Sequence, residues 1–188
     1  MMREQSKADH TSVLPAFLKY ASDGILLLGF LYVSLRVLYD YIAGGNSWKQ
    51  GDWLINNAAG SIRRGPLGSF IISIGDLVDL NPLFVVSVIQ IALLAVLFIT
   101  FRLLVTKLHN PRISILLVAS PAIFTIFWIA DPQGSVRKEL IAFSGLSLYA
   151  LGAVREKSSF LWLGTALFCI STLAHEAMVL FTPAFLAI

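Results

Sequence analysis

Three apolar stretches in this chain are each long enough to cross a lipid bilayer as a helix. They run from Gly24 to Ile42, from Leu83 to Phe101 and from Ile113 to Ala130. A hydrocarbon core about 30 Å thick is crossed by about 20 helical residues. Because a helix satisfies its own backbone hydrogen bonds, it is the form that such stretches take in lipid. The sequence therefore predicts an all-α membrane protein.

Further apolar stretches extend this prediction. Leu140 to Val154 and Phe160 to Ala174 predict two more helices, each of which needs flanking polar residues to complete a span. Ala177 to Ile188 predicts either a continuation of the fifth helix or a sixth helix after a break. We expect a polytopic transmembrane helix bundle of five to six spans over residues 21–188. The apolar C-terminal sequence indicates an N-terminal fragment of a longer protein, since a carboxylate buried in lipid is costly.

The composition agrees with a membrane protein and argues against other classes. Hydrophobic residues make up 57% of the chain and charged residues 13%, whereas a soluble domain has about 45–50% and about 25%. The 14 Lys and Arg residues are spread along the chain, so no concentrated basic face suggests nucleic-acid binding. Cys169 is the only cysteine, which excludes an intrachain disulfide. We expect it to pack as a small apolar residue.

The distribution of Lys and Arg predicts the orientation, because cytoplasmic connections carry an excess of these residues. Eight lie before the first predicted span and in two short connections, against five in the remaining connections. We therefore place residues 1–20 in the cytoplasm, and residues 44–81 and Asp131 to Gln133 outside. The eight are Arg3, Lys7, Lys19, Arg102, Lys107, Arg112, Arg155 and Lys157, and the five are Lys49, Arg63, Arg64, Arg137 and Lys138.

The connection from Gly44 to Asn81 is the longest in the chain. Loops of this length are usually functional or disordered, and its scattered aromatic and aliphatic residues argue against disorder. Trp48 and Trp53 are typical of a membrane–water boundary. We predict short interfacial helices at the outer headgroup level. Leu67 to Ile74 is too short to cross the membrane.

A first candidate site lies in this connection, where Arg63 and Arg64 are surrounded by Gly60, Gly65 and Gly68. Glycines let backbone amides approach an anion, and adjacent guanidiniums can bind a phosphate through paired hydrogen bonds. The same arginines could instead contact lipid phosphates at the membrane surface. The sequence leaves both interpretations open.

A second candidate site is the segment DPQGSVRKE, from Asp131 to Glu139. Ser135 is predicted to cap a helix whose first turns contain Arg137 and Lys138. Cations in the first turn of a helix oppose its dipole. The pair therefore indicates an anion held between the helix N-terminus and these side chains. A hydrophilic hairpin tip is the simpler alternative.

A third candidate site is His175 with Glu176, at the end of the fifth predicted helix. Ionisable residues at such depth are costly and usually face a cavity or a partner, so we favour a functional pair. Val179 stands where a HExxH zinc motif needs its second histidine, so no metal is predicted. Arg36 and Asp40, one helical turn apart near the outer end of the first helix, predict a structural pair.

The segments DWLINNAAGSIRRGPLG, DPQGSVRKE and HEAMVLFTP resemble the outer loops of bacterial polysaccharide repeat-unit polymerases, of the Wzy-type and EpsG-like families, and of related lipid-linked-sugar glycosyltransferases. These are scattered motifs, and none is a strict signature. The resemblance implies a bacterial inner membrane, a polyprenyl-diphosphate-linked saccharide as substrate, and other polysaccharide-assembly membrane proteins as partners. Members of these families have more spans than this chain, so the site here would be incomplete.

The chemistry implied by the resemblance needs cations for the departing diphosphate and a base for the acceptor hydroxyl. No cofactor is expected. The phosphate-binding candidates are Arg63, Arg64, Arg137 and Lys138, and the candidate bases are Glu176, His175 and Asp52.

Two alternative functions remain open. Asp52 lies in the first outer loop, where large membrane glycosyltransferases that use polyprenyl-phosphate sugars place a similar base, so a single-sugar transferase is one alternative. The other is a transporter or flippase that binds an anionic or lipid-linked substrate without making bonds. Pro121 and Pro183 would favour it if they break helices.

Overall fold

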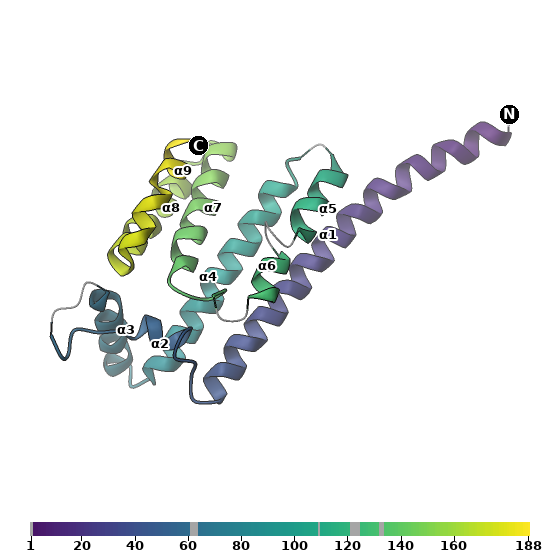
Figure 1. The fold of residues 1–188 in the computed structure, drawn as a ribbon. Helices are drawn as coiled ribbons and strands as arrows, with labels where there is room; N and C mark the ends of the chain where they lie inside the picture. Colours follow the sequence, from purple (N-terminus) through teal and green to yellow (C-terminus); the bar gives the residue numbers. More distant parts are fainter. Residues whose placement is uncertain (1, 61–63, 109, 121–124, 132–133) are drawn as a thin grey trace.

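A computed structural model of the protein describes residues 2–60, 64–108, 110–120, 125–131 and 134–188. All regular secondary structure in these ranges is helical, which confirms the predicted all-α class (Figure 1). Two helical segments among the described residues, Ala16–Ile42 and Pro82–Val105, are long and apolar enough to cross a membrane. The prediction of five to six spans is not confirmed by these two helical segments.

Helix α1 covers Met2–Ile42, so it begins well before the predicted start at Gly24. Its first part projects away from the other helices (Figure 1). One stripe of α1, which contains Val33 and Val37, is buried, whereas Leu28 and Leu35 are 68% and 64% exposed. Such a continuous exposed apolar surface is typical of contact with lipid or with an apolar partner.

Two short helices follow, α2 (Gln50–Trp53) and α3 (Gly65–Leu77), so the long connection contains short helices as predicted. Helix α3 packs closely on the preceding segment of the chain. A Cβ atom on Gly68 would lie 2.0 Å from the carbonyl oxygen of Ile55. Only glycine permits this approach, and it fixes the first turns of α3 beside residues 54–57.

Helix α4 (Pro82–Val105) is the central helix and contains the predicted stretch Leu83 to Phe101. The Asn81 side chain accepts a hydrogen bond from the Leu83 N–H at 2.8 Å, and Pro82 occupies the first turn, as is usual at helix starts. Helix α4 packs against α1 on one side and against α7 on another.

The predicted third helix, from Ile113 to Ala130, is not continuous, and this prediction was wrong. The structure has α5 (Pro111–Ala119) and α6 (Thr125–Ala130) instead. Ser120 is extended, with φ −69° and ψ 126°, and it directly precedes Pro121. A proline disfavours helical geometry in the residue before it, which explains why α5 ends there.

Helices α7 (Glu139–Arg155) and α8 (Ser158–Ala174) form an antiparallel hairpin, in agreement with the two shorter predicted helices. A Cβ atom on Gly145 would lie 2.9 Å from the Gly164 carbonyl oxygen, and one on Gly164 would lie 2.7 Å from the Gly145 carbonyl oxygen. Small residues that allow such close approach are a common basis of helix pairing in membranes. Cys169, which we expected to be packed, is exposed on α8.

The last apolar segment is separate from α8. His175 is extended, with φ −155° and ψ 110°, and it ends α8. A 3₁₀ helix, η1 (Glu176–Phe181), and a short helix, α9 (Thr182–Leu186), follow. The segment contacts α7 and α8, so the break after α8 is the correct one of the two predicted alternatives.

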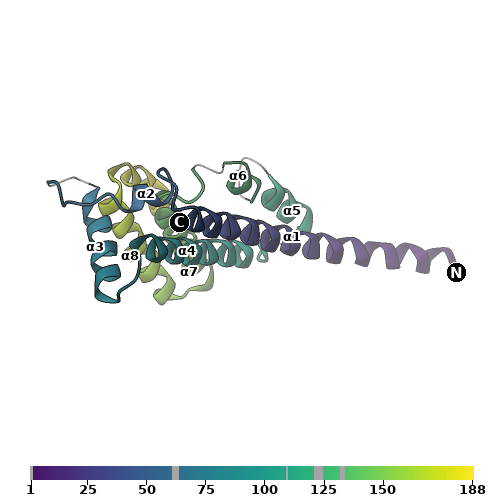
Figure 2. The same ribbon diagram turned by 90° about the horizontal axis from the view of Figure 1, so that it is seen from below.

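The helices lie in a row of neighbours. Figure 2 shows α5 and α6 on one side of α1 and α4 on the other, and contacts continue from α4 to α7 and from α7 to α8. The chain alternates in direction along this row (Figure 1). As a result, residues 40–60, 64–65, 134–139 and 175–176 meet at the lower end in Figure 1, here called the polar end. Residues 19–23, 102–108, 110–114 and 155–158 lie at the other end, here called the opposite end.

Candidate functional site

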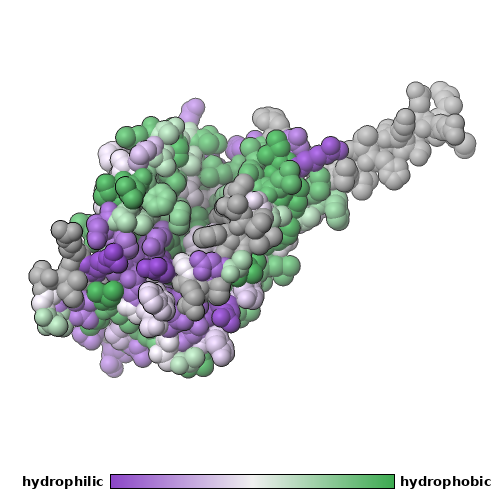
Figure 3. Space-filling model, viewed as in Figure 1, coloured by the Kyte–Doolittle hydropathy of each residue, from purple (hydrophilic) through white to green (hydrophobic). Residues whose placement is uncertain are grey.

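The polar end carries most of the hydrophilic surface visible in Figure 3, whereas the surface above it is mainly hydrophobic. Several ionisable side chains here are buried, and their residues are at most 8% exposed. Burying a charge is costly unless specific partners compensate for it. This burial argues against a solvated hairpin tip. The residues are Asp40, Lys49, Asp52, Lys138 and His175.

Two fully buried side chains hold the segment before α7 in place. The indole N–H of Trp53 and the side-chain amide of Gln90 both donate to the carbonyl oxygen of Val136, at 3.0 and 2.8 Å. These bonds join α2 and α4 to the chain that carries Arg137 and Lys138. The sequence analysis did not select Gln90. A single glutamine within the strongly apolar stretch of α4 was the available signal.

Asp40 forms an ion pair with Lys49 at 2.5 Å, so the predicted pairing of Arg36 with Asp40 was wrong. Gly44 and Gly45 both have positive φ values, and they reverse the chain so that Lys49 returns to the end of α1. The guanidinium of Arg36 instead lies over the ring of Tyr39, 5.8 Å from its centroid.

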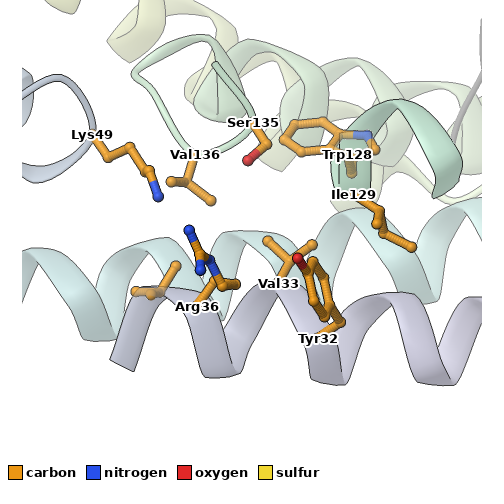
Figure 4. A pocket seen from close by; sticks show the side chains of 9 residues that line it. Tyr32, Val33, Arg36, Lys49, Trp128, Ile129, Ser135 and Val136 are labelled. Carbon is orange, nitrogen blue, oxygen red and sulfur yellow. The ribbon is translucent and has the colours of Figure 1, made fainter. Parts of the chain in front are cut away.

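Arg36 and Lys49 both point toward one small cavity between α1, α6 and the segment before α7 (Figure 4). The hydroxyl group of Ser135 and the ring of Trp128 complete its lining. Its volume of about 10 Å³ is enough for about one water molecule. Asp40 offsets the charge of Lys49, so Arg36 supplies the excess positive charge here.

Lys138 is completely buried, and its Nζ donates to the carbonyl oxygen of Arg64 at 3.2 Å. Burial lowers the pKa of Lys138, because a charged amine loses its hydration. Asp52 and Glu139 raise that pKa in part, and Arg64 lowers it further. Burial of the charged Lys138 side chain therefore has a net free-energy cost to folding.

The start of α7 differs from the prediction. The helix begins at Glu139, with Lys138 at the N-cap and no side-chain cap, whereas we expected Ser135 to be the cap. The Asp131 carboxylate accepts the Gly134 N–H at 2.9 Å, and this local turn delays helix formation. Arg137 and Lys138 thus precede the helix.

Arg64 lies at the N-terminus of α3 and connects two distant parts of the chain. Its carbonyl group binds Lys138, and its guanidinium lies 3.7 Å from the Glu176 carboxylate. Both side chains are accessible, at 37% and 53% exposure. A hydrogen bond from the backbone of Glu176 lowers the pKa of this carboxyl group, with a smaller contribution from Arg64. Glu176 is therefore ionised near neutral pH.

His175 faces Glu139 across the start of α7, with Nε2 and Oε1 4.0 Å apart. Nδ1 of His175 accepts the Ala177 N–H at 3.2 Å. In the neutral imidazole this bond places the proton on Nε2, toward the carboxylate. At 4.0 Å the two groups are close enough to attract each other electrostatically but too far apart for a hydrogen bond. Sequence patterns could not predict this proximity, because His175 ends α8 and Glu139 begins α7.

Four buried atoms at or next to the polar end have no hydrogen-bond partner among the described residues. They are Oδ2 of Asp52, Oε1 of Gln90, Nε of Arg137 and Oε2 of Glu139. Unpaired buried polar atoms are uncommon in folded proteins. A bound polar ligand or a water molecule would satisfy them, so the polar end retains hydrogen-bonding capacity of both signs.

The structure brings together one group from the predicted candidates, here called the Arg64 cluster: Arg64, Lys138, Glu139, His175 and Glu176. Asp52 lies close enough to influence Lys138. Among the described residues no hydrogen bond or ion pair joins the side chain of Arg137 to the cluster, and Arg63 lies outside these residues. No group of three His, Cys, Asp or Glu that could hold a metal ion occurs in the described part of the chain.

No protein-family model matches this chain, and no curated protein or solved structure is significantly similar to it.

Proposed function

We propose that this chain is an integral protein of the bacterial inner membrane. In this proposal the polar end binds a polyprenyl-diphosphate-linked glycan on the outer face, and the protein polymerises or transfers that glycan in cell-surface polysaccharide assembly. The observation that carries the proposal is the Arg64 cluster. It assembles cations, an acid–imidazole pair and an exposed carboxylate from three segments that are distant in the sequence.

The membrane location is supported by the apolar surface. Helices α1 and α4 each contain a stretch that could cross a membrane, and several leucines of α1, among them Leu28 and Leu35, are exposed. The excess of Lys and Arg at the opposite end supports a cytoplasmic position for that end. The polar end then lies outside, where lipid-linked repeat units are assembled in the families that this sequence resembles.

Diphosphate binding is supported by the exposure of Arg64 and by the unpaired Nε atom of Arg137. The guanidinium of Arg64 is partly exposed, and its pairing with Glu176 is long. A solvent-exposed pair of this kind is weak, so a diphosphate can replace the carboxylate as the partner of Arg64. Nε of Arg137 is buried without a partner among the described residues and is available as a further donor. The buried Lys138 ammonium group holds the backbone of Arg64 through a hydrogen bond to its carbonyl oxygen.

In the proposed transfer, the acceptor hydroxyl oxygen forms a bond to the anomeric carbon, and the bond from that carbon to the diphosphate breaks. The diphosphate leaves with the bonding electron pair, and the arginines stabilise its charge. The hydroxyl proton passes to a base, for which exposed Glu176 is the best placed carboxylate. Asp52 is only 8% exposed and lies near Lys138. Its position therefore favours a countercharge role over the base of the single-sugar transferase alternative.

Substitution of the arginines tests the proposal in the bacterium that carries this gene. Arg64→Ala or Arg137→Ala should abolish glycan extension, because loss of a charge-assisted phosphate contact costs several kcal/mol of transition-state stabilisation. Arg64→Lys should rescue poorly, since lysine lacks the planar fork. Arg112→Ala is the matched control, as it removes an exposed arginine at the opposite end. Surface glycan length on gels and protein level by immunoblot are the measurements.

Glu176→Gln separates a catalytic role from a structural one. If Glu176 is the base, the variant binds lipid-linked substrate but does not extend it, whereas a structural role predicts a lower protein level. Glycans of wild-type length in all of these variants, at normal expression, would refute the proposal. A defect in movement of the lipid-linked substrate, with intact glycan transfer, would identify the transporter alternative instead.

Cysteine labelling tests the orientation separately. Native Cys169 is exposed and is first replaced by Ser. Ser47→Cys, at the exposed polar end, should react with an impermeant thiol reagent in intact cells. Lys157→Cys, at the exposed opposite end, should react only after the membrane is ruptured. The reverse pattern would invert the topology and remove the outward-facing site.

A further inference from the structure

Two neighbouring cavities lie at and below the opposite end, the first between α1, α4 and α5 and the second between α1 and α4. The first has a volume of about 180 Å³ and a mixed lining, in which the charged groups of Lys19, Asp23 and Arg102 lie among apolar residues. The second, of about 320 Å³, has an apolar lining that includes Phe30 and Phe98. They have three lining residues in common, Asp23, Leu26 and Arg102. The two adjoining cavities are here called the hollow, and its charged groups lie in the upper part, above the apolar lower part.

The ion pair between Asp23 and Arg102 marks the boundary between the two parts. Nε and a terminal nitrogen of Arg102 contact the two carboxylate oxygens of Asp23, at 2.7 and 2.9 Å. These charges neutralise each other. Lys19 lies one helical turn before Asp23 and is exposed, and no carboxylate among the described residues lies within 4.0 Å of its ammonium group. Lys19 therefore supplies the net positive charge of the hollow.

The surroundings of the hollow are also positive. Six basic residues and two acidic residues of the described chain lie at the opposite end. The basic residues are Lys19, Arg102, Lys107, Arg112, Arg155 and Lys157, and the acidic residues are Asp23 and Glu156. A surface of this charge attracts anionic lipid headgroups over distances of about 10 Å at ordinary salt.

We propose that the hollow binds an anionic phospholipid, with its phosphate on Lys19 and one acyl chain along the apolar part beside Phe30 and Phe98. A free anion would leave the apolar cavity empty, and a neutral apolar molecule would leave Lys19 without a partner. An anionic phospholipid matches both parts in the right order. The site is separate from the polar end, and it requires only the membrane location from the function proposed above.

Native mass spectrometry of the full chain in a mild detergent tests this site. The probes are dioleoyl phosphatidylglycerol and dioleoyl phosphatidylcholine, each added in increasing amounts. The wild-type protein should bind phosphatidylglycerol more tightly. Lys19→Gln should weaken phosphatidylglycerol binding about fivefold, as expected for one lysine near an anionic headgroup. It should weaken phosphatidylcholine binding less, because the choline cation offsets the phosphate charge. Lys157→Gln, at the same end but outside the hollow, should change neither.

A second variant tests the acyl-chain part. Ile99 lines the apolar cavity and is 57% exposed, so Ile99→Trp can fill the cavity without disturbing the core. It should weaken the binding of both lipids. Leu35→Trp, at a similarly exposed position of α1 outside the cavity, should not. Equal affinity of the wild-type protein for the two lipids would overturn the proposal. Displacement of the lipid by inorganic phosphate alone would also overturn it, because it would show that the acyl chain contributes nothing.

Discussion

The two ends of the helix row carry their charged side chains in different ways. At the polar end, Lys49, Asp52 and Lys138 are at most 8% exposed. At the opposite end, the side chains of Arg102 and Asp23 are 48% and 28% exposed, and Arg112 is exposed. Both ends contain many charged side chains, but these side chains are buried only at the polar end. Because folding alone does not favour this burial, the difference singles out the polar end as the candidate functional site.

The connections explain the difference. At the opposite end the helices are joined by short turns, which leave their charges in solvent. At the polar end the long connection after α1 and the segment before α7 fold over the start of α4, where Trp53 and Gln90 bind Val136. Charges carried by these segments are covered as a consequence. The comparison predicts that substitutions at the two ends differ in size and in sign.

The largest expected effect is at Trp53, which is completely buried. Trp53→Ala should destabilise the protein by about 3–5 kcal/mol, the usual cost of removing a buried tryptophan. Thermal unfolding in detergent measures the change. Trp48→Ala is the matched control, because Trp48 lies in the same connection but is 66% exposed, and it should leave the unfolding midpoint almost unchanged. Equal effects of the two variants would show that the connection is not anchored as described.

Much of the helical framework could be predicted from apolar runs alone. The stretches that became α4, α7 and α8 were identified because each is a predominantly apolar run bounded by polar residues. The break between α5 and α6 was missed, because hydrophobicity continues across it while the conformation changes at Ser120. That change follows from Pro121, so a local backbone rule was given too little weight against the apolar pattern.

The candidate site was predicted only in part, for a different reason. Arg64 was expected outside because it lies in the long connection, and Glu176 because it follows the fifth predicted helix, and the structure places them 3.7 Å apart. The pairing of Asp40 with Lys49 and of His175 with Glu139 depends on how loops fold back and how helices pack. Periodicity gives no information on such contacts. Spacing along one helix suggested Arg36 for Asp40, and tertiary structure supplied Lys49.

A smaller effect, with an unusual pH dependence, is expected at Lys138. Burial lowers the pKa of this amine from 10.5, so the folded state binds its proton less readily than the unfolded state. Burial of the charged amine therefore lowers the free energy of unfolding at neutral pH. This destabilisation disappears as the pH rises from the lowered pKa toward 10.5. Lys138→Met should therefore be within about 1 kcal/mol of the wild-type stability, since apolar replacement of a buried charge is often neutral or stabilising.

The same variant separates function from stability. Lys138→Met should lose glycan extension while remaining folded, and the wild-type protein should gain stability relative to it as the pH is raised toward 10.5. Chemical unfolding at several pH values, together with glycan length, gives both readouts. A variant that is strongly destabilised at neutral pH would show that Lys138 is a structural residue, and the polar end would lose its main distinction.

The smallest effect is expected at the opposite end, for the pair of Asp23 and Arg102. The pair is bidentate but partly exposed, and exposed ion pairs typically contribute about 0.2–1 kcal/mol. Asp23→Asn, Arg102→Gln and the double variant form a cycle that isolates the pairwise term. The coupling energy should stay below about 1 kcal/mol and decrease as salt is added, because exposed charges are screened. A coupling of about 3 kcal/mol or more, the scale of a buried pair, would mean that charges at both ends are held alike, and burial would no longer distinguish the polar end.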